Sequence, residues 1–159
     1  MRNALFAFVM MALPTFAAAA LPNGAQHSAA SYRFIGLPIY DARLFTRAGA
    51  PLDWADDFSI ELTYNRNLTL FDLVEGTLRE MTRFGASLPA REKLETRDNT
   101  VRNGDRYLAL THGPYWISFW MNGTRTFTLN HPQIKRGFMA AFPSENTLSK
   151  SFTHKLKDE

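Results

Sequence analysis

The sequence predicts an α+β fold, with an antiparallel β-sheet and helices packed on one face of that sheet. Residues 58–68 alternate apolar and polar side chains, which is typical of a half-buried antiparallel strand. Residues 69–85 instead repeat apolar side chains with the period of a helix. An Asn-Gly pair at 122–123 separates two strand-like runs and indicates a type I′ hairpin. No strand alternates regularly with a crossover helix, so a doubly wound parallel sheet is not expected.

Residues 1–20 have the layout of a secretory signal peptide. A single basic residue precedes an apolar run, Ala4–Leu13, and Ala17–Ala20 supply the small residues of a cleavage site. The apolar run is too short to span a bilayer, which takes roughly 20 residues. We expect cleavage at the end of this segment, which makes residues 21–159 one mature domain and places it in the periplasm. An uncleaved membrane anchor is the alternative.

The mature chain is expected to begin with a loose polar lead-in, Leu21–Ala30, and to continue into one long strand, Tyr32–Phe45. This strand is rich in aromatic and β-branched residues. Pro38 inside it indicates an edge position or a β-bulge, because proline cannot donate a hydrogen bond to the ladder. Gly49–Asp57 is rich in turn-forming residues and separates this strand from the alternating one.

Four helices and three further strands complete the expected order. Thr69 is a suitable N-cap for the longest helix, and Gly85 is a suitable residue to follow its last turn. Asn130 and Pro132 are a cap residue and a first-turn proline for the helix after the hairpin. The expected helices cover residues 69–85, 89–97, 132–142 and 147–156, and the further strands are Arg106–Thr111, Tyr115–Met121 and Thr124–Leu129.

Composition and motifs exclude several classes of function. The formal charge of +3 comes from basic and acidic residues interspersed along the chain, whereas nucleic-acid binders usually show a clustered basic face. The absence of cysteine excludes disulfides, a thiol nucleophile and cysteine metal sites. The four histidines lack metal-binding spacing, and no serine hydrolase, phosphate-loop or dinucleotide motif occurs. We therefore expect no nucleic-acid partner, no metal and no cofactor.

Charged residues inside the first strand raise the question of a binding site. If this strand is continuous, Arg33 and Asp41 lie on one face and bracket the apolar residues Ile35, Leu37 and Ile39. One interpretation is a cationic anchor beside an apolar patch, which suits a carboxylate ligand. The other is that both charges lie at strand ends, reach solvent and form ion pairs with their neighbours.

Aromatic residues crowd one strand of the predicted hairpin. Tyr115, Trp116, Phe119 and Trp120 place large rings on both of its faces. Core packing on both faces explains this pattern. A sheet that presents one face to a ligand or to a protein partner explains it equally.

Five stretches, in this order, resemble the chalcone isomerase-like family, and in particular its small exported bacterial branch. They lie between Arg33 and Phe152, so the likeness extends over most of residues 21–159. The resemblance consists of an I-Y-D-A-x-L run after an arginine and a glycine, then a strand–helix, a G-D-R strand, an N-G hairpin and closing helices. The stretches are RFIGLPIYDARLF, IELTYNRNLTLFDLVEGTLREM, RNGDRYLAL, FWMNGTRTFTL and HPQIKRGFMAAFPSENTLSKSF.

The resemblance implies an open-faced sandwich. Plant members of the family close a chalcone ring, and other members bind fatty acids without chemistry. The plant enzymes hold an arginine upstream of the first strand, which Leu21–Ala30 lacks, and their closing tryptophan-leucine run is replaced here by AAFPS. We therefore expect a non-catalytic or accessory module that binds a small hydrophobic or acidic ligand.

The expected ligand-binding residues are Arg33, Tyr40, Tyr64 and Tyr107. No catalytic residue is assigned. The alternative function is an isomerase of the chalcone isomerase type, in which one of these tyrosines donates a proton and an arginine holds an oxyanion. A third interpretation is a protein-binding role in the cell envelope, with an exposed aromatic face as the contact surface.

Overall fold

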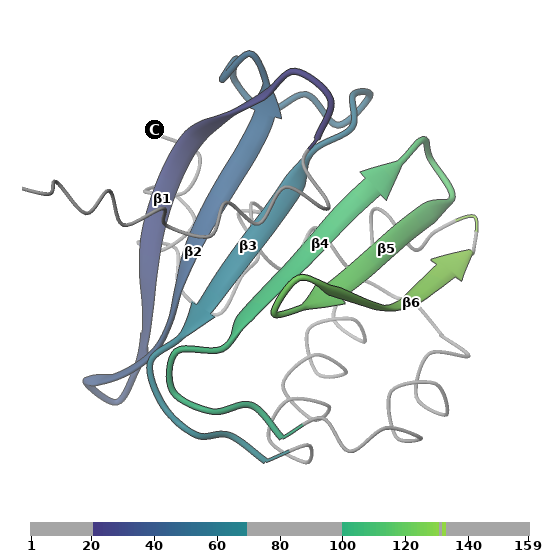
Figure 1. Cartoon of the computed structure of the whole chain (residues 1–159). Coiled ribbons are helices and arrows are strands. Elements are labelled where there is room, and N and C mark those ends of the chain that lie inside the picture. Colours follow the sequence, from purple (N-terminus) through teal and green to yellow (C-terminus); the bar gives the residue numbers. More distant parts are fainter. Residues whose placement is uncertain (1–20, 70–99, 131, 133–159) are drawn as a thin grey trace, which may run out of the picture.

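The computed structural model of the protein describes residues 21–69, 100–130 and 132, which form one six-stranded sheet (Figure 1). Strands that follow each other in the sequence are neighbours in the sheet, and every pair is antiparallel. Such a meander needs only short or medium connections, because antiparallel neighbours begin where the previous strand ends. The strands are β1 (Gly24–Phe34), β2 (Leu37–Arg47), β3 (Ser59–Tyr64), β4 (Arg106–His112), β5 (Trp116–Met121) and β6 (Thr124–Asn130).

The predicted α+β class, with helices packed on one face, is wrong for the part of the chain that the structure describes. That part contains strands, turns and bends but no helix. The described elements follow the period of a strand, as in β3, where alternate residues are buried more deeply. The antiparallel sheet itself was predicted correctly. The expected helices fall almost wholly on residues 70–99 and 133–159, outside the described residues.

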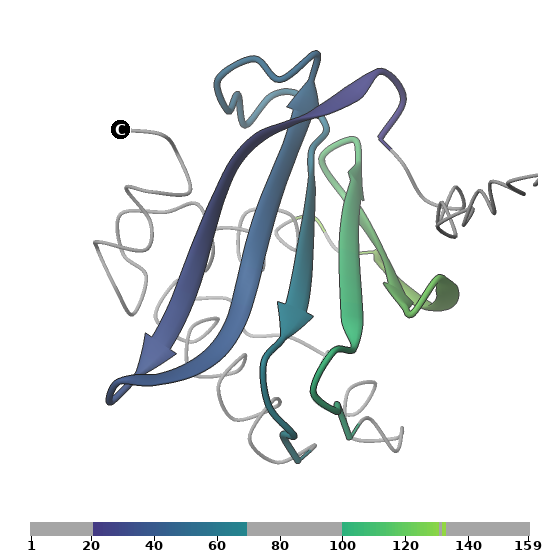
Figure 2. The ribbon, with the colours of Figure 1, turned by 60° about the vertical axis from the view of Figure 1, so that its left-hand side comes forward.

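The beginning of the sheet differs from the sequence-based expectation in two ways. Leu21–Ala30 was expected to be loose, but Gly24 already begins β1, whose small polar residues pair with β2 through backbone hydrogen bonds. Tyr32–Phe45 was expected to be one strand, but Ile35 and Gly36 fold it into the β1–β2 hairpin (Figure 2). Both turn residues have positive φ, 49° and 76°, as in a type I′ turn.

The bulge predicted from the proline in this segment is confirmed. The register of β1 and β2 shifts between Tyr32 and Arg33, where Tyr32 pairs with Tyr40 and Arg33 pairs with Pro38. The shift leaves one extra residue, Ile39, on β2. The alternative of an edge position does not apply, since β2 lies between β1 and β3.

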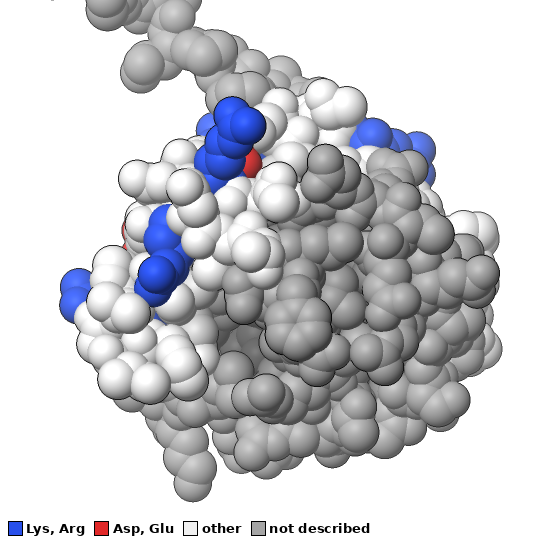
Figure 3. Space-filling view, turned by 90° about the horizontal axis from the view of Figure 1, so that it is seen from below, with Lys and Arg blue, Asp and Glu red and all other residues white. Residues whose placement is uncertain are grey.

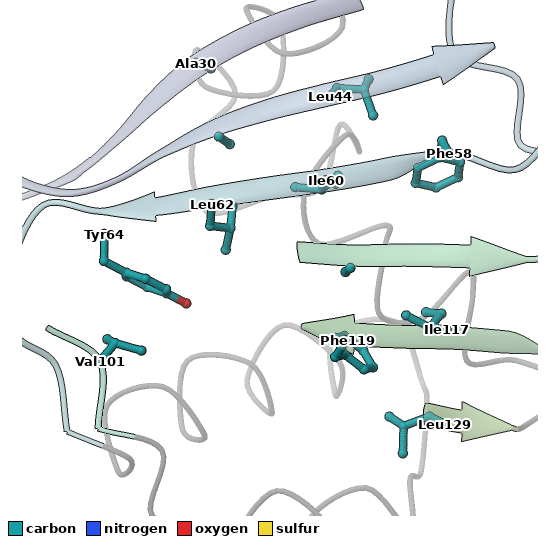
Figure 4. Packing of buried hydrophobic residues seen from close by; sticks show 12 residues of the cluster. Ala30, Leu44, Phe58, Ile60, Leu62, Tyr64, Val101, Ile117, Phe119 and Leu129 are labelled. Carbon is teal, nitrogen blue, oxygen red and sulfur yellow. The ribbon is translucent and has the colours of Figure 1, made fainter. Parts of the chain in front are cut away.

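One face of the sheet carries the hydrophobic core (Figure 4). Its central members are Leu44 on β2, Ile60 on β3, and Ile117 and Phe119 on β5, all almost completely buried. The other face of β2, β3 and β4 is mixed, with charged residues beside Leu108 and the buried Leu110. There Glu61 of β3 accepts hydrogen bonds from Arg43 of β2 and Arg106 of β4. The period of two therefore separates an apolar face from one that carries charged residues, which we call the charged face.

The β1–β2 and β5–β6 hairpins, both with a type I′ turn, allow a test of backbone strain. Asn122 and Gly123 adopt the same positive φ values, 49° and 83°, as Ile35 and Gly36. Asparagine tolerates this conformation, whereas a β-branched residue is strained in it. We expect Ile35→Asn to raise the free energy of unfolding by about 1 kcal/mol, measured by chemical denaturation.

The reciprocal change is the matched control. Asn122→Ile should lower stability, because it adds the same strain and also removes two hydrogen bonds, one from the Arg106 backbone N–H and one to Asp105. A loss of stability in Ile35→Asn would show that the tip isoleucine contributes to the fold, contrary to this account.

Candidate functional site

Three tyrosines stand side by side on the apolar face, one on each of the first three strands. Tyr32 pairs with Tyr40, which in turn pairs with Tyr64. The ring centroids of Tyr32 and Tyr40 are 5.1 Å apart in a stacked arrangement, and those of Tyr40 and Tyr64 are 6.1 Å apart edge to face. Both arrangements are the ones that aromatic quadrupoles favour. The antiparallel register therefore aligns the three rings across the strands.

The aromatic residues continue over the second half of the sheet. Tyr107 of β4 and Phe119 of β5 have ring centroids 5.7 Å apart, and Phe119 stacks on Phe127 of β6 at 4.5 Å. Because Tyr107 pairs with Leu62, it lies diagonally from Tyr64, two residues further back along β3. These six residues, which we call the aromatic row, are Tyr32, Tyr40, Tyr64, Tyr107, Phe119 and Phe127.

Four members of this row are tyrosines, and the hydroxyl groups of Tyr64 and Tyr107 are those with the deepest surroundings. Tyr64 is only 5% exposed, and Tyr107 is half-buried. Among the residues that the structure describes, neither hydroxyl has a hydrogen-bond partner. In Figure 4 the ring of Tyr64 points away from its strand, with Leu62 and Val101 to either side. Two phenol groups thus lie among apolar side chains of the described sheet.

Burial also fixes the protonation state of these two groups. It raises the pKa of the Tyr64 hydroxyl above its usual value, because the charged phenolate is poorly solvated among apolar side chains. Burial likewise raises the pKa of the Tyr107 hydroxyl, and the nearby Tyr64 adds to that shift. Both groups therefore stay protonated at any physiological pH, and each can donate one hydrogen bond.

The predicted charged residues lie elsewhere. Asp41 accepts hydrogen bonds from the Ser31 hydroxyl, at 2.5 Å, and from the Asn65 side-chain amide, at 3.0 Å. These two bonds, helped by the charge of Arg33, lower the pKa of the Asp41 carboxyl despite partial burial. Arg33 donates to the backbone carbonyl of Gly36 at 3.3 Å and so closes the hairpin. Since Ser31 and Asp41 alternate with the tyrosines of β1 and β2, this polar network belongs to the charged face.

Of the four residues predicted to bind ligand, the structure brings three together. Tyr40, Tyr64 and Tyr107 belong to the aromatic row, whereas Arg33 lies near Asp41 at the end of β1. The expected face of Arg33, Asp41 and an apolar triplet assumed a continuous strand, and the turn at Ile35 removes that geometry. The role of Arg33 as a carboxylate anchor stays a prediction.

The sequence-based site omitted half of the aromatic row. Tyr32, Phe119 and Phe127 were not assigned to it. Tyr32 pairs with Tyr40, while the ring of Phe119 contacts that of Tyr107 and stacks on that of Phe127. The signal that could have identified these residues is that aromatic side chains an even number of positions apart along a strand lie on the same face of the sheet. It can be used only when the turn positions and the cross-strand register are known.

Metal and membrane features were also sought in residues 21–69 and 100–130. No group of three histidine, aspartate or glutamate side chains in this part of the chain is arranged to hold a metal ion. The same residues include no helix with the length and hydropathy needed to cross a membrane.

Removal of the two hydroxyl groups tests their lack of protein partners. Tyr64→Phe and Tyr107→Phe delete no hydrogen bond to a described residue, so we expect the ligand-free protein to keep its stability or to gain some. A matched control is Thr111→Val. The Thr111 hydroxyl bonds to the backbone N–H of Phe58 at 2.9 Å, and its loss should cost about 1–3 kcal/mol. Denaturant titration near neutral pH measures both effects, and a comparable loss in the two phenylalanine variants would contradict our assignment.

The raised pKa values predict how stability changes in alkali. The unfolded chain loses tyrosine protons as the pH rises through about 10, whereas the folded protein holds them to higher pH. Stability due to these groups is therefore complete below about pH 10 and falls above it, with a slope that approaches about 1.4 kcal/mol per pH unit for each tyrosine. In each phenylalanine variant, the free energy of unfolding should fall less steeply with pH, by the contribution of the tyrosine that was replaced. Denaturant titrations at several alkaline pH values measure this slope. An unchanged alkaline slope would mean that the two hydroxyls titrate normally.

Comparison with known proteins adds a likeness to solved structures. A scan against protein-family models and a search of curated proteins gave no match. Among solved structures, the chain is similar to a fatty-acid binding protein of Arabidopsis thaliana, with a TM-score of 0.66 and 11% sequence identity over 89% of this chain and 90% of that one. At this identity the likeness shows the fold alone. It supports the chalcone isomerase-like fold that the sequence resemblance implies, while the exported bacterial branch stays a prediction.

Proposed function

We propose that this protein binds a small hydrophobic ligand with an acidic end group and acts as a non-catalytic or accessory module. The observation that carries the proposal is the pair of protonated hydroxyls on Tyr64 and Tyr107, which lie within an apolar face and lack partners among the described residues. Buried donors in native proteins normally find an acceptor. A ligand carboxylate supplies two acceptor oxygens and fits two neighbouring donors.

The remainder of the aromatic row provides the apolar contact surface. Tyr32 and Tyr40 extend it toward β1, and Phe119 and Phe127 extend it toward β6. Apolar pockets with a few convergent polar groups are the usual form of small-molecule sites. The similar Arabidopsis protein is named as a fatty-acid binding protein, which supports a ligand of this class here. Arg33 is left outside the proposed site, because it lies with the polar network of Asp41.

The pKa shifts favour binding over isomerase chemistry. A general acid works best when its pKa lies near the working pH. Burial moves the pKa values of Tyr64 and Tyr107 in the opposite direction, so these hydroxyls hold their protons tightly. Such groups suit a site that donates hydrogen bonds to an anion without transferring a proton.

The first experiment is native mass spectrometry of the purified protein, followed by organic extraction and by titration with oleate. We expect a co-purifying acidic lipid or saturable binding of oleate. Tyr64→Phe and Tyr107→Phe should each weaken oleate binding about tenfold, because each removes one hydrogen bond to a charged group. Tyr115→Phe makes the same chemical change on an exposed residue at the far end of the sheet and should bind normally.

Two outcomes would contradict the proposal. One is the absence of both a co-purifying ligand and oleate binding. The other is equal affinity for oleate in the wild type and in both phenylalanine variants. Methyl oleate separates the two parts of the site: it keeps the hydrocarbon chain but lacks the carboxylate charge, so we expect it to bind more weakly than oleate and to discriminate less between wild type and variants.

We also propose that the protein is exported and that residues 21–159 are its mature form in the periplasm. The basic residue, apolar run and alanine cluster of residues 1–20 support this proposal. Intact-mass analysis of the protein expressed from the whole sequence tests it. We expect the mass of a chain whose N-terminus lies near residue 21. A full-length product confined to the cytoplasm would overturn export.

A further inference from the structure

The tip of the β1–β2 hairpin exposes three large apolar side chains. Phe34 is 56% exposed, Ile35 86% and Leu37 51%. We call these three residues the hairpin tip. It closes the corner of the sheet at the lower left of Figure 1 and projects clear of β3 in Figure 2. Scattered apolar residues are common on protein surfaces, but a contiguous apolar projection usually marks a contact surface.

The tip is unfavourable for the isolated molecule in two respects. Ile35 is β-branched and has a φ of 49°, a conformation in which such residues are strained. Its side chain is also the most exposed of the large apolar residues and gains little from packing. The hairpin at Asn122 solves the same turn geometry without either cost. A strained and exposed isoleucine therefore indicates a contact outside the described fold.

The charges around the tip indicate what that contact is. In this meander the β1–β2 turn, the β3–β4 connection and the β5–β6 turn all lie at one end of the sheet. This end carries four exposed arginines, Arg33, Arg66, Arg102 and Arg125, and none of them forms a salt bridge with another described residue. Viewed from this end, the described surface shows several blue basic side chains and little red (Figure 3).

The opposite end of the sheet has the reverse character. There the loop before β3 carries Asp53, Asp56 and Asp57, with Arg47 at the end of β2. At the hairpin end the acidic residues are Asp41 and Asp105, and side-chain hydrogen bonds hold both. The described sheet is thus polarised, with most of its exposed arginines at the end that carries the apolar tip and three aspartates in the loop at the other end.

We propose that the hairpin tip docks on an anionic lipid surface. The three apolar side chains would enter the boundary between headgroups and acyl chains, where their transfer from water is favourable. The arginines would lie at the depth of the phosphates, which they bind through charge-assisted hydrogen bonds. A second copy of the chain is a poorer occupant, since two such ends would bring arginines against arginines.

The proposed docking places the lipid next to the proposed ligand site. Phe34 lies two positions after Tyr32 on β1, so the two side chains share one face of the sheet. Leu37 of β2 is the pairing partner of Phe34. The tip therefore leads into the first residues of the aromatic row. A hydrophobic ligand could pass from a membrane to this face without crossing bulk water. Lipid docking itself does not depend on the ligand proposal and is tested separately.

Vesicle flotation tests the docking. Purified protein, with its N-terminus read by intact mass, is floated with vesicles of phosphatidylcholine alone or of phosphatidylcholine and phosphatidylglycerol in equal amounts. We expect binding to the anionic vesicles that falls as salt is raised. Ile35→Asn and Phe34→Ser should each lower the partition coefficient about tenfold, because each removes one buried apolar side chain. Arg66→Gln should weaken binding to the anionic vesicles only.

Matched controls separate docking from general effects on the fold. Tyr115→Ser removes an aromatic side chain of similar exposure at the acidic end and should leave partition unchanged. Ile35→Asn is expected to stabilise the fold while it weakens lipid binding, a combination that unfolding cannot produce. Tyr64→Phe should bind vesicles normally, so failure of the ligand proposal is distinguishable from failure of this one.

Three results would overturn the proposal. The first is a wild-type protein that does not float with anionic vesicles. The second is flotation that is equal in wild type, Ile35→Asn and Phe34→Ser. The third is self-association in the absence of lipid that Ile35→Asn abolishes, measured by sedimentation velocity, which would assign the tip to contact with a second copy of the chain.

Discussion

The antiparallel register of β2, β3 and β4 decides which side chains meet on each face of the sheet. On one face, Glu61 stands between Arg43 and Arg106 and joins the three strands through two ion pairs. A slip of one residue would carry these charges onto the apolar face, where unpaired burial is costly. The same register places Tyr40 opposite Tyr64 and Tyr107 diagonally beyond it. The charged face and the candidate site are therefore consequences of one alignment.

Two features of the sheet depart from what stability alone would favour. The hydroxyls of Tyr64 and Tyr107 stay protonated among apolar residues, where phenylalanine would fill the same space without a polar group. Ile35 holds a strained conformation at an exposed turn, where asparagine would not be strained. Local rules of folding are most often broken at functional sites. The first departure points to a ligand with an acceptor group, and the second to an apolar surface outside the protein.

The sequence predicted those parts of the sheet whose signals are local. The alternation of β3 and the Asn-Gly turn between β5 and β6 depend on few residues, and both were predicted correctly. The β1–β2 turn was missed because isoleucine is a rare residue at positive φ, and β1 was missed because its small polar residues pair through the backbone. Three of the four predicted site residues share the aromatic row, but their proximity depends on cross-strand register, which one sequence does not specify. Arg33 was placed with them only through the strand that the turn interrupts.

The central claim is that the hydroxyls of Tyr64 and Tyr107 contact the polar end of a hydrophobic ligand. The most direct measurement is carbon NMR of protein labelled at the tyrosine ring carbon that bears the oxygen, recorded during titration with oleate. The account predicts that the signals of Tyr64 and Tyr107 shift together and saturate, while that of the exposed Tyr115 stays in place. Saturable oleate binding that leaves the Tyr64 and Tyr107 signals unmoved would contradict it.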